Sequence, residues 1–405
     1  MNWGQRAQDR LSDIARCSVD GEGVTRFPFT SQHEAALDAI RSWMSQAGLQ
    51  VHMDAAGTLI GRKDGPEGAP TFLIGSHQDS VRNGGGYDGI MGVVLGCLAL
   101  EKLAADGNEL PFSVEILAFA DEEGVRFPTA LMGPRALAGT FDPAVLAMTD
   151  SDGVSLRNAL AGFGGDPDRV AALARDPAKT LGYLEIHIEQ GPVLEAQDTA
   201  LGIVTGICGI ERNTVTFTGD TGHAGTVPMD SRRDALVAAS DFISAIHDAA
   251  KKVTDLRATI GALSLHPNVV NAIPRAVELT LEIRALNDAV RDDFARLARY
   301  LGDNISGERR VGFSMERTYE QPAVPCNGDL IDALSTATGA ICPTAPRLPS
   351  GATHDASAMA DLCPISMLFV RCEDGVSHKP EEFAASDDMD AAIQSIAAFL
   401  VALEV

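Results

Sequence analysis

The chain is short of positive charge. It has 32 Lys and Arg against 56 Asp and Glu, which gives a formal net charge of −24. Nucleic acid and anionic membrane surfaces bind through a surplus of basic side chains, so we expect neither as a partner. No apolar run approaches the roughly 20 residues of a transmembrane helix. The first 17 residues read as an amphipathic helix without the apolar core of a signal peptide.

The sequence also lacks closely spaced cysteine pairs. The seven cysteines include no CxxC pair, and their odd number favours reduced thiols in a cytoplasmic protein. A hydrophobic content of 45% with 22% charged residues is ordinary for a soluble globular protein. A length of 405 residues exceeds what one core normally fills, so two domains are expected.

Apolar runs with high β-propensity alternate with helical stretches in the outer parts of the chain. We predict interior strands at 71–75, 112–120, 183–189 and 365–372, with a helix between the first two. This alternation predicts an α/β fold, with a mixed, largely parallel sheet covered by helices on both faces.

The middle of the chain has a different pattern. Its order is β-α-β-β-α-β, which is typical of a ferredoxin-like α+β sandwich. The predicted elements are strands at 212–220, 257–267, 276–286 and 310–319, and helices at 231–250 and 288–302. We therefore predict an inserted domain at 208–320 and a discontinuous domain formed by 1–207 and 321–405.

Imidazoles or carboxylates lie near or just after the end of each predicted interior strand. They are His77, Asp79 and Asp88; Asp121, Glu122 and Glu123; His187 and Glu189, followed by Gln190; and Glu373, Asp374 and His378. Ligands of open α/β sheets collect at the carboxyl ends of the strands, and these donors suit a dinuclear divalent-metal site. A lone histidine after a strand is more often an ordinary loop residue, and an acidic pair is more often a solvated turn. Four strand ends in agreement favour the metal.

The loop GSHQDSVRNGGGYDG at 75–89 holds three consecutive glycines. We expect Gly84, Gly85 and Gly86 to adopt positive φ and let the loop fold back, so that Asp88 approaches His77. A phosphate-binding loop is the alternative, but no GKS or GKT follows and the loop carries acids.

Six segments together resemble one family. GSHQDSVRNGGGYDG, DEEGVRF, HIEQGPVLE, GHAGTVPMDSRRD, SGATHDA and GVSHKPEEF are similar, in this order, to signatures of the hydantoinase/carbamoylase-type amidases. That group includes N-carbamoyl-L-amino-acid hydrolases, β-ureidopropionases and allantoate amidohydrolases, within the dinuclear metallo-aminoacylase/carboxypeptidase superfamily. The resemblance implies a metallopeptidase-like catalytic domain with an inserted lid and dimerisation domain.

The resemblance also implies a ligand set for two divalent ions per subunit. His77, Asp88 and His187 would hold one ion, and Asp88, Glu123 and His378 the other, with Asp88 as the bridge. Nitrogen and oxygen donors of this kind suit zinc, manganese, cobalt or nickel.

The catalytic roles follow from the same resemblance. Asp79 would orient His77, as a carboxylate behind a metal-bound imidazole does. Glu122 would be the general base, since adjacent side chains point in different directions and leave Glu122 off the metal. His223 would reach a neighbouring subunit's active site in a homodimer and stabilise the oxyanion. Without the resemblance, a histidine in a Gly-rich loop is more simply a helix cap.

The substrate would be a small carboxylic acid. Asn271 and Arg284 match the residues that bind its carboxylate, although an arginine ending a strand is usually a surface charge. Gln190 and Gly351 would line the cleft. Thr353 stands where the family usually has glycine, and segment 206–213 lacks a common aromatic residue. Both departures bear on substrate choice.

The activity that this resemblance implies is hydrolysis of the carbamoyl C–N bond of an N-carbamoyl-L-amino acid. Allantoate or a related ureido acid is the nearest alternative, and an N-acyl amino acid or dipeptide is a more distant one. A catalytically silent binding protein would have lost a ligand or the base, and all of them are present in the sequence.

Overall fold

The computed structural model describes residues 2–403. Contacts divide the chain into two compact units. Unit 1 comprises Met1–Thr205, Cys326–Leu348 and Ala352–Val405, and unit 2 comprises Gly206–Pro325 with Pro349–Gly351. The short piece at 349–351 lies outside the insert that the sequence predicts at 208–320.

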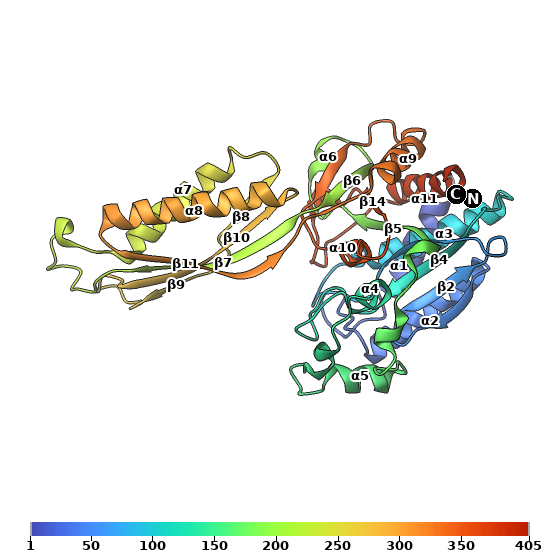
Figure 1. Ribbon diagram of the computed structural model, residues 1–405, viewed down its shortest axis with the longest axis horizontal. Coiled ribbons are helices and arrows are strands. Elements are labelled where there is room, and N and C mark those ends of the chain that lie inside the picture. The colour runs from blue at the N-terminus through green and yellow to red at the C-terminus, as the bar shows by residue number, and fades with distance from the viewer. Residues whose placement is uncertain (1, 404–405) are drawn as a thin grey trace. The chain divides into compact units, whose positions relative to one another are not determined.

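The larger sheet of the protein is mixed and nine-stranded (Figure 1). Its strand order is β1 (Gln50–Met53), β2 (Leu59–Lys63), β4 (Ser113–Phe119), β3 (Thr71–His77), β5 (Thr180–Ile188), β14 (Ile365–Val370), β6 (Leu201–Ile207) and β12 (Val324–Pro325), and β13 (Arg347–Ser350) pairs with β6. The central strands β4, β3, β5 and β14 run parallel, and the flanking pairs are antiparallel. The α/β prediction is confirmed.

Helices bury this sheet. They are α1 (Trp3–Ile14), α2 (Ser31–Gln46), α3 (Ile90–Ala105), α4 (Met132–Ala138), α5 (Leu156–Phe163), α6 (Val193–Ala196), α9 (Gly328–Gly339), α10 (Asp355–Met359) and α11 (Ser386–Ala402). Every residue of β4 and β14 is buried, as expected of strands covered on both faces. Helix α3 packs against β3, β4 and β5, and its first eleven residues, Ile90 to Leu100, are all buried. The parallel strands are therefore held rigidly, and their carboxyl ends meet at one edge.

Unit 2 is an antiparallel sheet with two helices. The sheet has the order β11 (Gly312–Gln321), β7 (Gly209–Thr218), β10 (Ala276–Ala285) and β8 (Leu256–Thr259), and β9 (Leu263–His266) also pairs with β10. Helices α7 (Ala235–Ala250) and α8 (Asp288–Arg309) pack on it through a core that includes Phe217, Phe242 and Phe294.

Two elements of unit 2 differ from the sequence prediction. The strand predicted at 257–267 is two short strands, β8 and β9, which pair with opposite ends of β10. Helix α8 continues past the predicted end at residue 302 to Arg309, and Gly302 lies against Phe313. A Cβ there would lie 2.1 Å from the Phe313 ring, so the missing side chain makes room for that ring.

Two of the expected absences can be checked on the described chain. Within residues 2–403, no helix combines the length and apolarity that crossing a bilayer requires. All seven cysteines are free thiols.

Candidate metal centre

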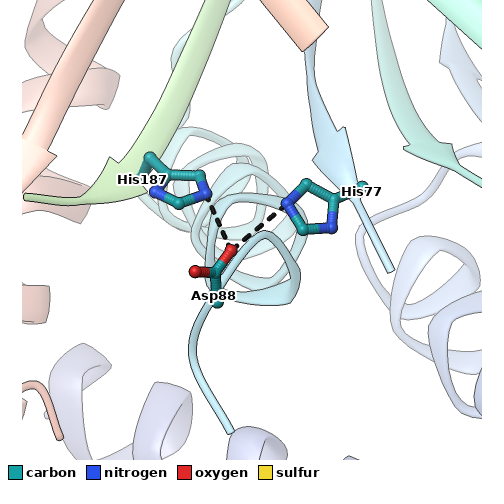
Figure 2. Close-up of side chains that lie close together, drawn as sticks. All are labelled: His77, Asp88 and His187. Carbon is teal, nitrogen blue, oxygen red and sulfur yellow. Dashed lines mark ion pairs between the residues drawn. The ribbon is translucent and has the colours of Figure 1, made fainter. Parts of the chain in front are cut away.

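Two histidines end neighbouring parallel strands. His77 is the last residue of β3, which runs two residues beyond the predicted 71–75, and His187 lies one residue before the end of β5. Their side chains are only 2% and 1% exposed. Figure 2 shows both imidazoles pointing toward Asp88, which precedes α3. The Asp88 Oδ1 atom lies 3.3 Å from His77 Nε2 and 3.1 Å from His187 Nε2.

The other oxygen of Asp88 faces a second set of donors. Asp88 Oδ2 lies 3.5 Å from His378 Nε2, and His378 Nε2 lies 3.7 Å from Glu123 Oε1. The donor atoms of His77, Asp88 and His187, and those of Asp88, Glu123 and His378, each lie within 4.8 Å of one another. The structure thus brings together both predicted ligand sets, with Asp88 shared.

Backbone carbonyls fix the orientation of the two strand histidines. His77 Nδ1 lies 3.0 Å from the Asp79 carbonyl oxygen, and His187 Nδ1 lies 3.0 Å from the Ile188 carbonyl oxygen. A carbonyl only accepts, so each Nδ1 carries the proton and donates it. In the neutral rings the Nε2 lone pairs then face Asp88, as metal ligands require.

The Asp79 side chain connects the two sets. Its carboxylate lies 3.5 Å from His77 Nδ1. Its two oxygens also accept the backbone N–H groups of Glu122 and Glu123, each at 3.2 Å. Asp79 therefore holds the acidic pair after β4 in place as well as facing His77.

Glu122 has a free carboxylate. Its side-chain oxygens accept no hydrogen bond from residues 2–403, and Oε2 lies 4.0 Å from His77 Nε2. Burial raises the pKa of Glu122 well above its ordinary value, against the lowering effect of His77. His77, Glu122 and Glu123 form a third group of donor atoms within 4.8 Å, which the sequence did not predict. Since this group shares His77 and Glu123 with the other two, it competes with them for the same ions.

Burial and neighbouring charges both shift the pKa values of the candidate ligands, often in opposite directions. Burial works to lower the pKa of His77, but hydrogen bonds to Asp79 and Asp88 raise it well above normal. Burial works to raise the pKa of Asp88, but His187 and the other histidines lower it well below normal. Burial and Asp88 raise the pKa of Glu123 to about 7. The hydrogen bond to Asp88 raises the pKa of His378 to about 9.

The donor set fits divalent cations. Glu123 Oε1 is buried and has no hydrogen-bond partner among residues 2–403, although it belongs to two of the three groups. The set with His77 and His187 supplies two imidazoles and one carboxylate, and the set with Glu123 and His378 supplies two carboxylates and one imidazole. Both sets leave coordination positions open for water or substrate. A cation there would favour the charged carboxylates that burial otherwise disfavours.

Polar side chains that the sequence did not assign to the bridge also contact Asp88. Gln190 Nε2 and Ser377 Oγ donate to Asp88 Oδ2 at 2.7 and 2.8 Å. Gln190, which the sequence places in the substrate cleft, is a direct partner of the shared carboxylate. Its own Oε1 is buried without a hydrogen-bond partner in the described chain.

The glycine prediction for this loop is wrong in its mechanism. Gly84, Gly85 and Gly86 lie outside the positive-φ region, and the loop turns instead at Asn83 (φ 54°) and Gly89 (φ 67°). A Cβ at Gly89 would lie 2.3 Å from the His77 ring. The loop folds back as expected, but the glycine that must lack a side chain beside His77 is Gly89.

Three further acids, Glu185, Asp121 and Asp355, are buried. Asp121 was among the candidate donors at the strand ends, whereas Glu185 and Asp355 were not predicted as site residues. Glu185 on β5 accepts hydrogen bonds from Ser76 Oγ at 3.0 Å and from the Ala356 N–H at 2.7 Å. Asp121 and Asp355 are 0% exposed, and their carboxylate oxygens have no hydrogen-bond partner within residues 2–403. Burial raises the pKa of all three. Asp121 was singled out by its place directly after a predicted strand, but no motif or spacing marked Glu185 or Asp355.

The remaining predicted site residues belong to unit 2. His223 pairs with Ala272 in an isolated β-bridge, and the Ala224 N–H donates to the Asn271 carbonyl at 3.0 Å, so His223 and Asn271 lie on adjoining segments. His223 Nδ1 accepts the Gly225 N–H at 3.0 Å. The proton of the neutral ring is then on Nε2, which is left as a donor.

Arg284 and Gly351 also lie together within unit 2. Arg284 Nη1 donates to the Gly351 carbonyl oxygen at 2.6 Å, and Arg284 Nε donates to Glu282 at 2.8 Å. These two bonds orient the guanidinium at the end of β10. A Cβ on Gly351 would meet nothing within 4 Å, so the space beside it is open.

Comparisons with known proteins bear on this arrangement. The model of Peptidase family M20/M25/M40 matches residues 48–402. An N-carbamoyl-L-amino acid amidohydrolase from Geobacillus stearothermophilus is 40% identical over 390 residues, covering 96% of this chain and 95% of that protein. An allantoate deiminase from Arabidopsis thaliana is 37% identical over 423 residues, covering 96% and 81%.

A solved structure shares the whole fold. The crystal structure of an amidase of the hydantoinase/carbamoylase family from Burkholderia multivorans superposes with a TM-score of 0.92 at 31% identity, covering 98% of this chain and 97% of that one.

Proposed function

Because the chain belongs to Peptidase family M20/M25/M40, we propose that it is a metal-dependent amidohydrolase acting on N-carbamoyl-L-amino acids. One water is consumed, the carbamoyl C–N bonds break, and the products are the amino acid, ammonia and carbon dioxide. The likeness to the Geobacillus stearothermophilus amidohydrolase supports this substrate class.

One observation supports the proposal most strongly: the two oxygens of Asp88 face two different sets of donors. Oδ1 faces His77 and His187, and Oδ2 faces His378 in the set that includes Glu123. A carboxylate shared in this way is what a two-metal hydrolase needs.

Two divalent ions, of zinc, manganese, cobalt or nickel, would be held by these sets. When bound, they supply a Lewis acid for the ureido carbonyl and lower the pKa of water. Asp79 holds the backbone of Glu122 and Glu123, and Gln190 and Ser377 hold Asp88, so the ligands are oriented by neighbours that are themselves hydrogen-bonded.

Glu122 is the general base of this proposal. Its carboxylate accepts no hydrogen bond from the described residues and adjoins the ligand Glu123. It takes a proton from the attacking water, and then delivers it to the departing nitrogen. Proton transfer through a positioned side chain of this kind contributes about 10²–10⁴-fold in rate.

The unit 2 residues would recognise the substrate. The His223 Nε2–H donates to the oxyanion that forms at the ureido carbonyl, because its Nδ1 is occupied by the Gly225 N–H. Arg284, oriented by Gly351 and Glu282, binds the substrate carboxylate together with Asn271.

We place His223 in the active site of a second copy, in a homodimer. Val270 is 103% exposed and Val269 55%, and both precede Asn271 in the segment that pairs with the His223 loop. Adjacent exposed apolar side chains suit a surface that another protein covers. Mixing Glu122→Gln chains with His223→Ala chains then restores activity, since one site of each mixed dimer has both residues intact. Two variants that stay inactive after mixing would contradict action in trans.

A substrate panel tests the reaction. Ammonia release is measured on N-carbamoyl-L-amino acids, on allantoate and on N-acetyl amino acids with one enzyme preparation. We expect the highest kcat/KM for an N-carbamoyl-L-amino acid. A higher value for allantoate would establish the alternative that the Arabidopsis thaliana allantoate deiminase favours, and no activity on any of the three would contradict the proposal.

A further inference from the structure

One buried carboxylate joins two loops that lie far apart in the sequence. Glu382 Oε1 accepts the backbone N–H groups of Tyr87 and Asp88, each at 2.9 Å. Glu382 Oε2 accepts the backbone N–H of His378 at 3.3 Å and lies 3.1 Å from Ser377 Oγ. Glu382 therefore connects the loop of the shared ligand Asp88 to the loop of the ligand His378.

These contacts fix backbone, so they act on the ligands without touching a cation. Each of the three N–H groups belongs to a ligand residue or to its chain neighbour. Glu382 is only 4% exposed, and hydrogen bonds donated to an ionised carboxylate are about twice as strong as bonds between neutral groups. Losing this acceptor would leave three buried backbone N–H groups without a hydrogen-bond partner, which is unfavourable.

Ser377 completes the connection. Its Oγ lies 2.8 Å from Asp88 Oδ2 and 3.1 Å from Glu382 Oε2, between the two carboxylates. A hydroxyl has one proton, so it donates to one of them at a time. The shorter distance favours Asp88, and the connection to Glu382 then rests on the three backbone donors.

The middle glycine of the GGG run is explained by this carboxylate. A Cβ at Gly85 would lie 2.3 Å from Cβ, Cδ and Oε1 of Glu382. Gly85 has no positive φ, so its requirement is space and not backbone conformation. A Cβ at Gly86 would meet only Ala15 Cβ, at an ordinary 3.7 Å. The two glycines thus differ in whether a methyl group would displace Glu382.

We propose that Glu382 is a positioning residue that sets the distance between Asp88 and His378, and thereby the affinity of the His378 side of the centre. This rests on the proposed metal centre. Glu382 touches neither substrate nor the reacting atoms. Groups that orient metal ligands typically contribute about 10–100-fold in metal affinity.

The experiment measures metal binding to the full-length chain. Wild type, Glu382→Ala and Glu381→Gln are stripped of metal and titrated with Co²⁺ and with Zn²⁺ against a coloured chelator. The exposed neighbour Glu381 makes a matched control for charge. We expect Glu382→Ala to bind one Co²⁺ about 10–100-fold more weakly and to show an altered Co²⁺ visible spectrum. Glu381→Gln should match wild type.

A glycine pair gives a second test that leaves Glu382 in place. Gly85→Ala should weaken Co²⁺ binding in the same direction, whereas Gly86→Ala should bind like wild type. If Glu382→Ala does not fold, the comparison of Gly85→Ala with Gly86→Ala still tests the role of Glu382. Excess Co²⁺ should restore the wild-type spectrum to Gly85→Ala, which a general loss of structure would not allow.

The outcomes separate the two proposals. Wild type that binds no metal would overturn the metal centre and the role of Glu382 with it. Wild type that binds two ions, beside folded Glu382→Ala or Gly85→Ala chains with affinities within about twofold of wild type, would overturn the role of Glu382 alone.

Discussion

The two sides of the candidate centre are built differently. On the strand side, His77 and His187 lie at the ends of adjacent buried strands, are 2% and 1% exposed, and have their Nδ1 atoms fixed by backbone carbonyls. On the loop side, the His378 side chain is 50% exposed and its backbone has φ of 60°. A sheet positions the first pair, whereas the loop of His378 is held by side-chain contacts, among them the Glu382 carboxylate.

This difference shows where rigidity comes from in the centre. Strand ligands inherit their place from hydrogen-bonded neighbours along β3, β4 and β5, which are buried throughout their central residues. A loop ligand depends on a few side-chain contacts that one substitution can remove. We therefore expect the strand side to bind its ion more firmly than the loop side.

The largest expected effect comes from removing what both sides share. Asp88→Ala deletes the carboxylate whose two oxygens face the two sets, so both ions should be lost and ammonia release should fall to background. Metal analysis and turnover on the preferred substrate measure this. Asp106→Ala, on the surface beside Lys102, is the control and should behave as wild type. Retention of both ions by Asp88→Ala would show that the carboxylate is not a bridge.

The next largest effect separates chemistry from metal binding. Glu122→Gln should lower kcat by about 10²–10⁴-fold and keep both ions, because the amide cannot take the proton. Kinetics and metal content are measured on the same preparation. If Glu122→Gln loses an ion, the group of His77, Glu122 and Glu123 is the true ligand set.

A smaller effect on metal binding is expected at Asp79, whose side chain contacts residues of both sides of the centre. Asp79 faces His77 and accepts the N–H groups of Glu122 and Glu123, so Asp79→Ala should weaken metal affinity by about 10–100-fold. Asp79→Asn keeps one accepting oxygen, so its metal affinity should lie between those of wild type and Asp79→Ala. Titration with Zn²⁺ against a chelator measures the affinities. Equal Zn²⁺ affinity in wild type, Asp79→Ala and Asp79→Asn would show that the Asp79 side chain orients none of the metal ligands.

The smallest expected effect is a difference in rate between the two sides. Chelator added to the Co²⁺-loaded chain should remove the ions in two phases, separated by about tenfold or more, with the loop side first. The His378 side chain is half exposed, whereas His77 and His187 are buried. Loss of cobalt absorbance follows both phases. In His378→Ala the fast phase should disappear, and a fast phase that persists there would reverse the assignment.

Much of this arrangement could be predicted from the sequence because parallel strands gather their carboxyl ends. His77 and His187 follow from apolar runs, and the order of strands and helices predicted the α/β class that the structure shows. The connection through Glu382 could not be predicted, because its partners at Tyr87 and Asp88 are backbone N–H groups 295 and 294 residues away. No residue pattern records such a contact.

The requirement for glycine at two positions could not be predicted from the sequence. The GGG run was assigned to positive φ, but its role at Gly85 is to leave room for Glu382, and the turn lies at Asn83 and Gly89. The helix predicted at 288–302 continues to Arg309, and Gly302 within it leaves room for the Phe313 ring. In each case a glycine is required by a neighbour distant in sequence, and only the folded chain shows that neighbour.

The central claim is that Asp88 lies between two ions held by the two sides, and anomalous diffraction from crystals grown with Zn²⁺ tests it most directly. The account predicts two peaks about 3.5–4 Å apart, one beside His77 and His187 and one beside Glu123 and His378, with Asp88 between them. A single peak, or a peak bounded by His77, Glu122 and Glu123, would contradict it.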